Sequence, residues 1–228
     1  MSANNPTRSG LQPLVINGQR KPRKQRKAGK AVKKDIFGSN TRTSVSTFRV
    51  FYDRGDLPVK IDQGVRRRIE FLVPVKHLDI SYYLPVFLDG LKEQAEPFKF
   101  IAYEGAKALV VHGGRRILAC IADCVLRLKG AFKTRNPEII SRALVVLQKL
   151  ALCKDNFVGE ALVQHFSQLL PVCNFFFTSK RTVRGASDEK ITLGDLVVQT
   201  LYILERQGGP DAFINIKYVV AAFDKPVE

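Results

Sequence analysis

Long apolar runs are missing from this 228-residue sequence. A helix needs about 20 consecutive apolar residues to cross a bilayer. The densest apolar stretch, residues 169–177, is interrupted by Pro171 and Asn174. We therefore expect a soluble protein with no membrane partner.

Cysteine is also scarce, with four residues in the whole chain. No apolar signal segment stands at the N-terminus to indicate export, and secreted disulfide scaffolds carry far more cysteine. We therefore expect free thiols and a reducing compartment.

Residues that could carry catalysis are few. The three histidines are His77, His112 and His165, and the last falls on an apolar helical stripe, where a core or interface imidazole is expected. Cys120 and Cys124 share a helix face, but no second closely spaced pair completes a zinc site. Neither double glycine continues into a phosphate-binding motif. These absences predict no enzyme activity, no metal and no cofactor.

Acidic residues are outnumbered, with 21 Asp and Glu against 37 Lys and Arg, a formal net charge of +16 and a pI near 9.9. Such an excess indicates a polyanionic partner. Nucleic acid, an acidic protein polymer and a membrane surface all fit this charge.

Most of the excess lies in residues 1–46, where 11 Lys and Arg stand against one acid, Asp35, and one aromatic residue, Phe37. This small amount of apolar surface cannot offset the conformational entropy that the chain loses on folding. We therefore expect a disordered basic arm. Nonspecific binding to an anionic surface, a nuclear import signal at residues 20–34, an organelle presequence and a solvated tail all remain open. The arm's candidate binding residues are Arg20, Lys21, Arg23, Lys24, Arg26, Lys27, Lys30, Lys33 and Lys34.

Residues 47–228 read as a second, helical domain. Apolar residues at helical spacing predict helices over 82–94, 97–111, 115–132, 137–151, 157–169 and 193–207. Asn136-Pro137-Glu138 and Thr192 through Asp195 are typical helix starts, and Gly208-Gly209-Pro210 is a stop signal. The fold class is therefore all-α, either an armadillo- or HEAT-like solenoid or a compact bundle.

Three stretches of this domain do not show the helical period. Residues 48–79 carry turn signals and an alternation at Ile69, Phe71 and Val73, so we expect a loop-rich lead-in with a short strand. Residues 178–190 are rich in Ser, Thr and charge and predict a surface loop. Residues 213–220 alternate apolar and polar positions, which predicts an extended, docked segment.

The domain closely resembles the parkin co-regulated gene protein family of cilia. The matching segments run in order across nearly all of residues 47–228: FYDRGDLP (51–58), YYLPVFLDGL (82–91), HGGRRIL (112–118), LLPVCN (169–174), GDL (194–196) and AFINIKYVV (212–220).

The resemblance implies an armadillo-like structural protein without catalysis. It implies a position inside ciliary doublet microtubules, at the inner junction between the A- and B-tubules of the axoneme. The implied partners are α- and β-tubulin, a small β-rich junction protein and other microtubule inner proteins. The nine arm residues named above are the candidate tubulin-binding residues. A basic nucleic-acid-binding or nuclear protein that uses the same arm is the alternative.

Overall fold

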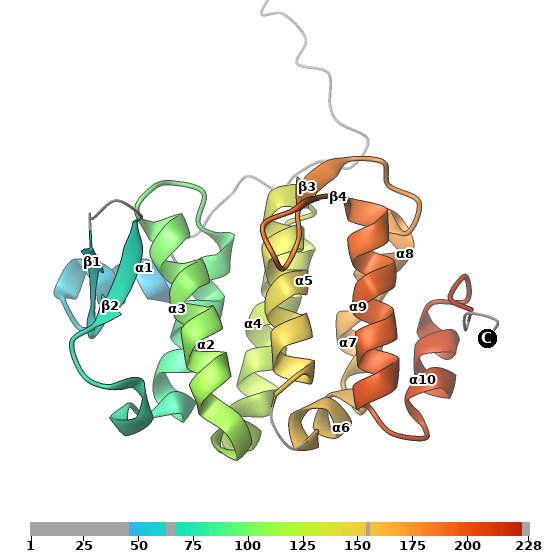
Figure 1. Ribbon diagram of the computed structural model, residues 1–228, viewed down its shortest axis with the longest axis horizontal. Coiled ribbons are helices and arrows are strands. Elements are labelled where there is room, and N and C mark those ends of the chain that lie inside the picture. The colour runs from blue at the N-terminus through green and yellow to red at the C-terminus, as the bar shows by residue number, and fades with distance from the viewer. Residues whose placement is uncertain (1–45, 63–66, 154–155, 225–228) are drawn as a thin grey trace, which may run out of the picture. The chain divides into compact units, whose positions relative to one another are not determined.

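The computed structural model describes residues 46–62, 67–153 and 156–224, and these residues are mostly helical (Figure 1). The helices, in chain order, are α1 (Thr47–Arg54), α2 (Ile80–Asp89), α3 (Phe98–Gly113), α4 (Ile121–Lys133), α5 (Pro137–Ala151), α6 (Phe157–Val163), α7 (Phe166–Leu169), α8 (Pro171–Phe176), α9 (Leu193–Gln207) and α10 (Ala212–Val219), with 3₁₀ segments η1 (Val75–His77), η2 (Gly90–Lys92) and η3 (Gly114–Cys120). The helical expectation is confirmed.

The described residues also include two small antiparallel sheets of two strands each. β1 (Val59–Asp62) pairs with β2 (Arg68–Phe71), and β3 (Thr182–Arg184) pairs with β4 (Lys190–Thr192). The short strand expected around Ile69 and Phe71 is therefore present as β2.

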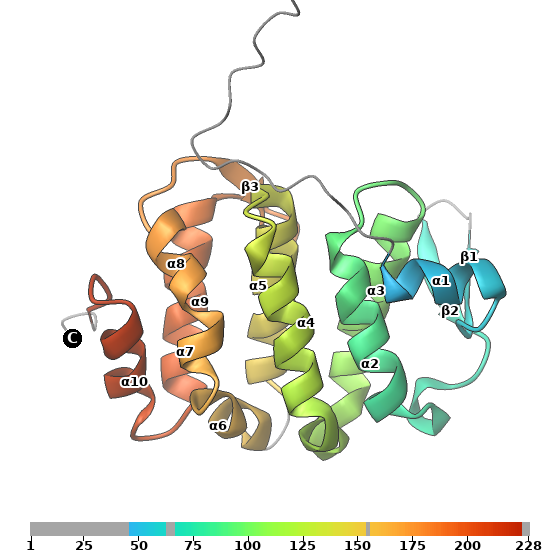
Figure 2. The same ribbon diagram turned by 180° about the vertical axis from the view of Figure 1, so that it is seen from behind.

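Many helices pack on helices one or two places away in the chain, but α5 also packs closely on α9, and α4 and α10 both contact α7. Figure 1 shows α1, β1 and β2 beside α2 and α3, followed by α4 and α5, then α7 to α9, with α10 last. Figure 2 shows the same order from behind. α5 is the central element, because it contacts α3, α4, α6 and α9.

The core follows from this central position of α5. Every residue of α5 from Ile139 to Gln148 is buried, including Val145 and Val146, which lie off the expected stripe. A helix enclosed by neighbours on several sides needs apolar side chains around most of its circumference. The expected stripes of α4 and α9 are buried as well.

The predicted helix starts have the expected capping geometry. The Asn136 side chain accepts a hydrogen bond from the backbone N–H of Glu138, with Pro137 in the first turn. The Thr192 hydroxyl oxygen accepts one from the backbone N–H of Asp195. These side chains satisfy backbone donors that the helix itself leaves without partners.

The lead-in over residues 48–79 was expected to be loop-rich, and the helix α1 corrects this. Ser46 caps its start by accepting from the Arg49 N–H, and Gly55 ends it at φ 77°. A glycine in the left-handed region is a common helix terminator. Both signals are in the sequence, although only Phe48 of α1 is fully buried, so the apolar period is weak.

The C-terminal stretch was predicted to be extended, and this was wrong, because residues 212–219 form α10. Ala212, Ile216 and Val220 are buried and lie four residues apart, which is a helical spacing hidden within the apparent alternation. Ile214 and Tyr218, which produced the alternation, are 69% and 90% exposed.

Two further predictions need correction. The single helix over 157–169 is divided into α6 and α7, and the His165 N–H bonds the Leu162 carbonyl in a tighter turn between them. The surface loop over 178–190 contains β3 and leads into β4. Val183 and Ile191 face each other in that hairpin and pack against the core.

Candidate interaction site

Side chains that could catalyse a reaction or bind a metal are dispersed over the described part of the chain. Across residues 46–62, 67–153 and 156–224, no three His, Cys, Asp or Glu side chains gather as metal ligands would. The four cysteines are buried free thiols, with the Sγ atoms of Cys120 and Cys124 3.8 Å apart. His165 is half-buried, and its Nε2 is buried without a hydrogen-bond partner among the described residues. No helix in these ranges is long and apolar enough to span a membrane.

The candidate tubulin-binding residues of the arm, from Arg20 to Lys34, lie outside the described residues. So does the rest of the predicted arm apart from Ser46. The geometry available for a site is therefore that of the helical unit, which offers a polar cluster beneath α1 and a charged cavity beside β3 and β4.

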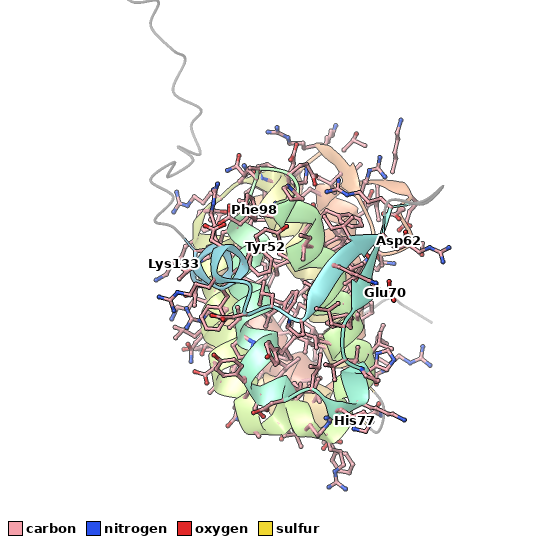
Figure 3. The ribbon with its side chains drawn as sticks, turned by 90° about the vertical axis from the view of Figure 1, so that its left-hand side faces the viewer. Tyr52, Asp62, Glu70, His77, Phe98 and Lys133 are labelled. Atoms are coloured by element: carbon pink, nitrogen blue, oxygen red, sulfur yellow. The ribbon has the colours of Figure 1, made fainter. Side chains whose placement is uncertain are left out.

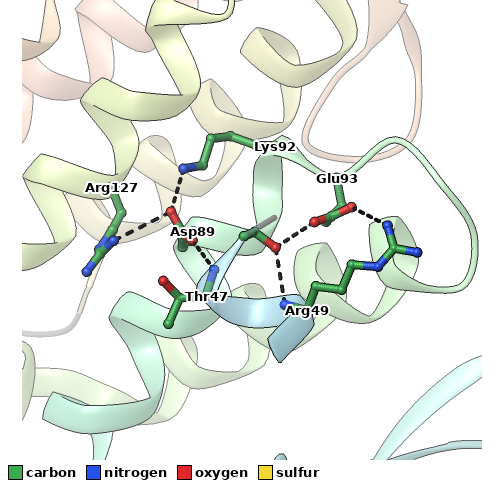
Figure 4. Close-up of polar contacts among 7 residues, drawn as sticks. Thr47, Arg49, Asp89, Lys92, Glu93 and Arg127 are labelled. Carbon is green, nitrogen blue, oxygen red and sulfur yellow. Dashed lines mark hydrogen bonds and ion pairs between the residues drawn. The ribbon is translucent and has the colours of Figure 1, made fainter. Parts of the chain in front are cut away.

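The polar cluster holds the start of α1 against the end of α2 (Figure 4). The Asp89 carboxylate accepts a hydrogen bond from the Thr47 backbone N–H at 2.8 Å. The same carboxylate pairs with Lys92 at 2.5 Å and with Arg127 of α4 at 3.6 Å. One acid therefore connects α1, η2 and α4.

The groups around Asp89 stabilise its ionised form. Burial raises the pKa of this carboxyl, but the hydrogen bond and charge of Lys92, the Thr47 N–H and the charge of Arg127 outweigh it, so the pKa lies below its ordinary value of 3.8. A buried charge in a protein needs partners of this kind. The cluster is ionised at neutral pH.

Glu93 forms the second half of the cluster. It accepts a hydrogen bond from the Ser46 hydroxyl at 2.5 Å and pairs with Arg49 at 3.8 Å. Arg49 also lies over the ring of Phe98, 4.4 Å from its centroid. Figure 3 looks onto this end of the unit and shows Tyr52 beside Phe98, two rings in edge-to-face contact at 5.1 Å.

The charged cavity lies between α3, the start of α5 and the β3–β4 hairpin, and has a volume of about 680 Å³. Figure 1 shows the hairpin crossing the start of α5. The cavity is lined by Glu96, Lys99, Phe100, Tyr103, Glu104, Glu138, Ser141, Arg142, Arg181, Thr182, Val183, Arg184, Asp188 and Lys190.

Arg142 forms the floor of this cavity and is only 8% exposed. Its Nε donates to the Glu138 carbonyl at 3.2 Å and its Nη2 to the Glu93 carbonyl at 3.1 Å. Its Nη1 is buried and has no hydrogen-bond partner among the described residues. Burial lowers the pKa of Arg142, which the charges of Glu138, Tyr103 and Glu96 partly oppose, but a guanidinium remains charged at neutral pH.

Sequence reasoning missed both features, although each left a signal. Asp89 is an acid within the apolar stretch 84–91, and Arg142 is a cation between Ile139–Ile140 and Ala143–Leu144. Charged residues within apolar stretches are almost never buried without a partner. Asp89 and Arg142 each have one partner that is distant in the sequence, Thr47 at 42 positions and Glu93 at 49, and no local pattern gives that information.

Comparison with known proteins agrees with the sequence motifs. The family model described as "Parkin co-regulated protein" matches residues 46–225. A mouse (Mus musculus) protein described as "Parkin coregulated gene protein homolog" is 38% identical over 184 residues, which cover 78% of this chain and 76% of the mouse protein. The match spans all helices of the described unit, so the resemblance is confirmed. The chain therefore belongs to the parkin co-regulated protein family.

Proposed function

We propose that this protein is a structural, non-enzymatic microtubule-associated protein of the cilium or flagellum. In this proposal it bridges the A- and B-tubules at the inner junction of axonemal doublets. Family membership across residues 46–225 is the observation that carries the proposal. The proposed partners are α- and β-tubulin, a small β-rich junction protein and other microtubule inner proteins.

The charge of the chain supports this proposal. Tubulin is acidic, and a ligand with a net charge of +16 is attracted to it by long-range electrostatics. The arm concentrates 11 of the cations within 46 residues. We propose that the arm is disordered alone and becomes ordered on the microtubule. On a repeating lattice each copy makes several contacts, so weak individual contacts suffice through avidity.

The packing order of the helices supports an armadillo-like solenoid as the finer description of the fold. In a solenoid each element contacts mainly its neighbours in the chain. α2 contacts α3 and α4, α4 contacts α5, and α9 contacts α10. The contact between α5 and α9 skips the three short helices between them, of which α6 contacts both, α8 contacts α9 and α7 contacts α4.

Sedimentation with taxol-stabilised microtubules tests the role of the arm. Reversing Arg23, Lys24, Arg26 and Lys27 to glutamate lowers the charge of the arm from +10 to +2, by two for each substitution. We expect weaker sedimentation than wild type at low salt, with a smaller difference at high salt because salt screens both surfaces.

A matched control reverses four exposed cations of the helical unit, Lys76, Lys133, Lys180 and Arg206, and changes the net charge equally. Equal loss from both variants would show that net charge alone drives binding. If the arm is held by shape, the arm variant would bind normally and Leu14→Ser with Phe37→Ser would be damaging.

Localisation separates this function from the alternative. A tagged full-length chain is expected in the axoneme, whereas a nuclear or nucleic-acid-binding protein would accumulate in the nucleus. A gel shift with random-sequence RNA and DNA measures the alternative directly. Binding to nucleic acid that exceeds binding to microtubules at the same salt would contradict our proposal.

A further inference from the structure

The β3–β4 hairpin carries an unusual pair of like charges. Arg184 and Lys190 face each other across the two strands. Like charges directly opposite in an antiparallel pair repel and destabilise the sheet. The hairpin therefore contains a local repulsion that an anion placed between the two side chains would remove.

The other hairpin of the same chain shows the usual arrangement. In β1–β2, Lys60 faces Glu70 and Asp62 faces Arg68, and the Lys60–Glu70 ion pair measures 3.1 Å. Asp62 and Glu70 are both visible on that hairpin in Figure 3. Each cation there has an acid opposite, so the like-charge pair of β3–β4 is particular to the hairpin that borders the cavity.

The acids near the cavity do not neutralise the hairpin cations. Glu138 pairs with Lys99 at 3.8 Å, Glu96 with Arg67 at 3.1 Å and Glu104 with Lys107 at 2.7 Å. Glu189, in the turn of the hairpin, accepts from the Ser187 N–H. Within residues 46–62, 67–153 and 156–224, no carboxylate lies within ion-pair distance of Arg181, Arg184 or Lys190.

The floor of the cavity has the same deficit. Arg142 is buried and charged there, and its Nη1 has no acceptor among the described residues. Leaving such a donor unsatisfied is costly, so a water, an ion or a ligand is expected to supply the acceptor. The cavity therefore has one buried cation below and three exposed cations on one wall, while three of its four lining acids, Glu96, Glu104 and Glu138, are paired with cations outside the hairpin.

We propose that this cavity binds an acidic peptide segment of a partner protein, with one side-chain carboxylate held between Arg184 and Lys190, above Arg142. The carboxylate would accept charge-assisted hydrogen bonds from the hairpin cations and supply the missing counter-charge. The rings of Phe100 and Tyr103 line the same cavity and offer apolar contact to the peptide's backbone and neighbouring side chains.

A peptide fits this cavity better than a nucleic acid does. Glu96, Glu104 and Asp188 line the cavity together with the cations. A continuous phosphate backbone carries one charge per nucleotide and would be repelled by these acids. A peptide with isolated carboxylates places negative charge only where the cations are. The arm of this chain does not have this chemistry, because its 11 cations against one acid would be repelled by the cations of the cavity.

The test measures binding of a fluorescein-labelled Gly-Glu-Gly-Glu-Gly peptide to the full chain by fluorescence anisotropy. The cavity variant is Arg181→Glu with Arg184→Glu, and the control is Lys76→Glu with Lys133→Glu. All four positions are exposed, and both variants change the net charge by the same amount, so any contribution of the basic arm is equal in the two. We expect roughly tenfold weaker binding for the cavity variant and little change for the control.

Two further variants and a labelled oligonucleotide complete the test. Arg181→Lys with Arg184→Lys retains the charge and is expected to bind the peptide. Arg142→Met is expected to weaken peptide binding, and circular dichroism verifies that this variant is folded. If it does not fold, the exposed variant Arg181→Glu with Arg184→Glu still tests the proposal. Three results would overturn the proposal: equal loss of peptide binding in the cavity and control variants, no peptide binding by wild type, or binding of a labelled oligonucleotide that depends on Arg181 and Arg184 more than peptide binding does. These results are independent of microtubule sedimentation, so either proposal can fail alone.

Discussion

Replacing Asp89 by asparagine is the sharpest test of the polar cluster that holds α1. The substitution keeps the shape and an acceptor for the Thr47 N–H, but it removes the charge that Lys92 and Arg127 face. Losing the charge from one hydrogen bond costs about 1 kcal/mol. The two ion pairs add about 1 kcal/mol more, less than in a fully buried pair, since Lys92 and Arg127 are 29% and 38% exposed.

The expected loss is therefore about 2 kcal/mol, which lies between the values for exposed and buried pairs. Urea unfolding of the full chain, followed by circular dichroism, measures it as a midpoint lowered by about 1 M. Glu70→Gln is the matched control, because its pair with Lys60 is exposed on both sides and surface pairs contribute at most about 1 kcal/mol. A midpoint for Asp89→Asn equal to that of wild type, or a loss no greater than that of Glu70→Gln, would refute the reasoning.

The same carboxylate predicts an acid dependence. The pKa of Asp89 is lower in the folded state than its ordinary value of 3.8, so its contribution to stability is complete above that pH and disappears as pH falls through the folded pKa. Wild type and Asp89→Asn should therefore differ by a constant amount from pH 5 to 7 and converge below about pH 4. A difference that persists unchanged into strong acid would contradict the assigned direction.

Three further predictions concern the core. Leu144→Asp should prevent folding, because this side chain of α5 is completely buried and an unpaired buried charge costs several kcal/mol; a normal cooperative melt would show that this face of α5 meets solvent. Gly105→Ala should lower stability by about 1–3 kcal/mol, since the added Cβ would lie 2.1 Å from Phe87, whereas Gly130→Ala, whose added Cβ would meet Lys92 Nζ at an ordinary contact distance of 3.8 Å, should be neutral or stabilising. Burial raises the pKa of Cys173 to about 12, so Ellman's reagent should modify this thiol only as fast as the protein unfolds, and rapid labelling of native protein would contradict that.

Helices whose signals are local could be predicted from the sequence. α5 and α9 each combine a side-chain cap with an apolar stripe, and Gly208 ends α9. The cap and the stripe report the same helix independently, so their agreement is strong evidence. α10 shows the opposite case, because an eight-residue helix contains only two full turns and its exposed Ile214 and Tyr218 imitate the period of a strand.

The candidate site was not predictable, for a different reason. Asp89, Glu93 and Arg142 acquire their roles from contacts across more than 40 residues, which are set by how α1, α2 and α5 pack. The like-charge pair of Arg184 and Lys190 becomes visible only once the register of β3 and β4 is known. The sequence shows that these residues are charged. Whether an opposite charge lies beside each of them is decided by the packed structure.

The attachment of α1 has a mechanical consequence for the bridging role that we propose. A pull on the chain before Ser46 acts first on the hydrogen bonds from Ser46 to Glu93 and from Thr47 to Asp89. Such bonds break after a small extension, since their geometry tolerates little displacement. Behind them only Phe48 of α1 is fully inserted, against Phe87 at 5.5 Å. We therefore expect tension on this part of the chain to separate α1 from the rest of the unit before α2 to α10 unfold.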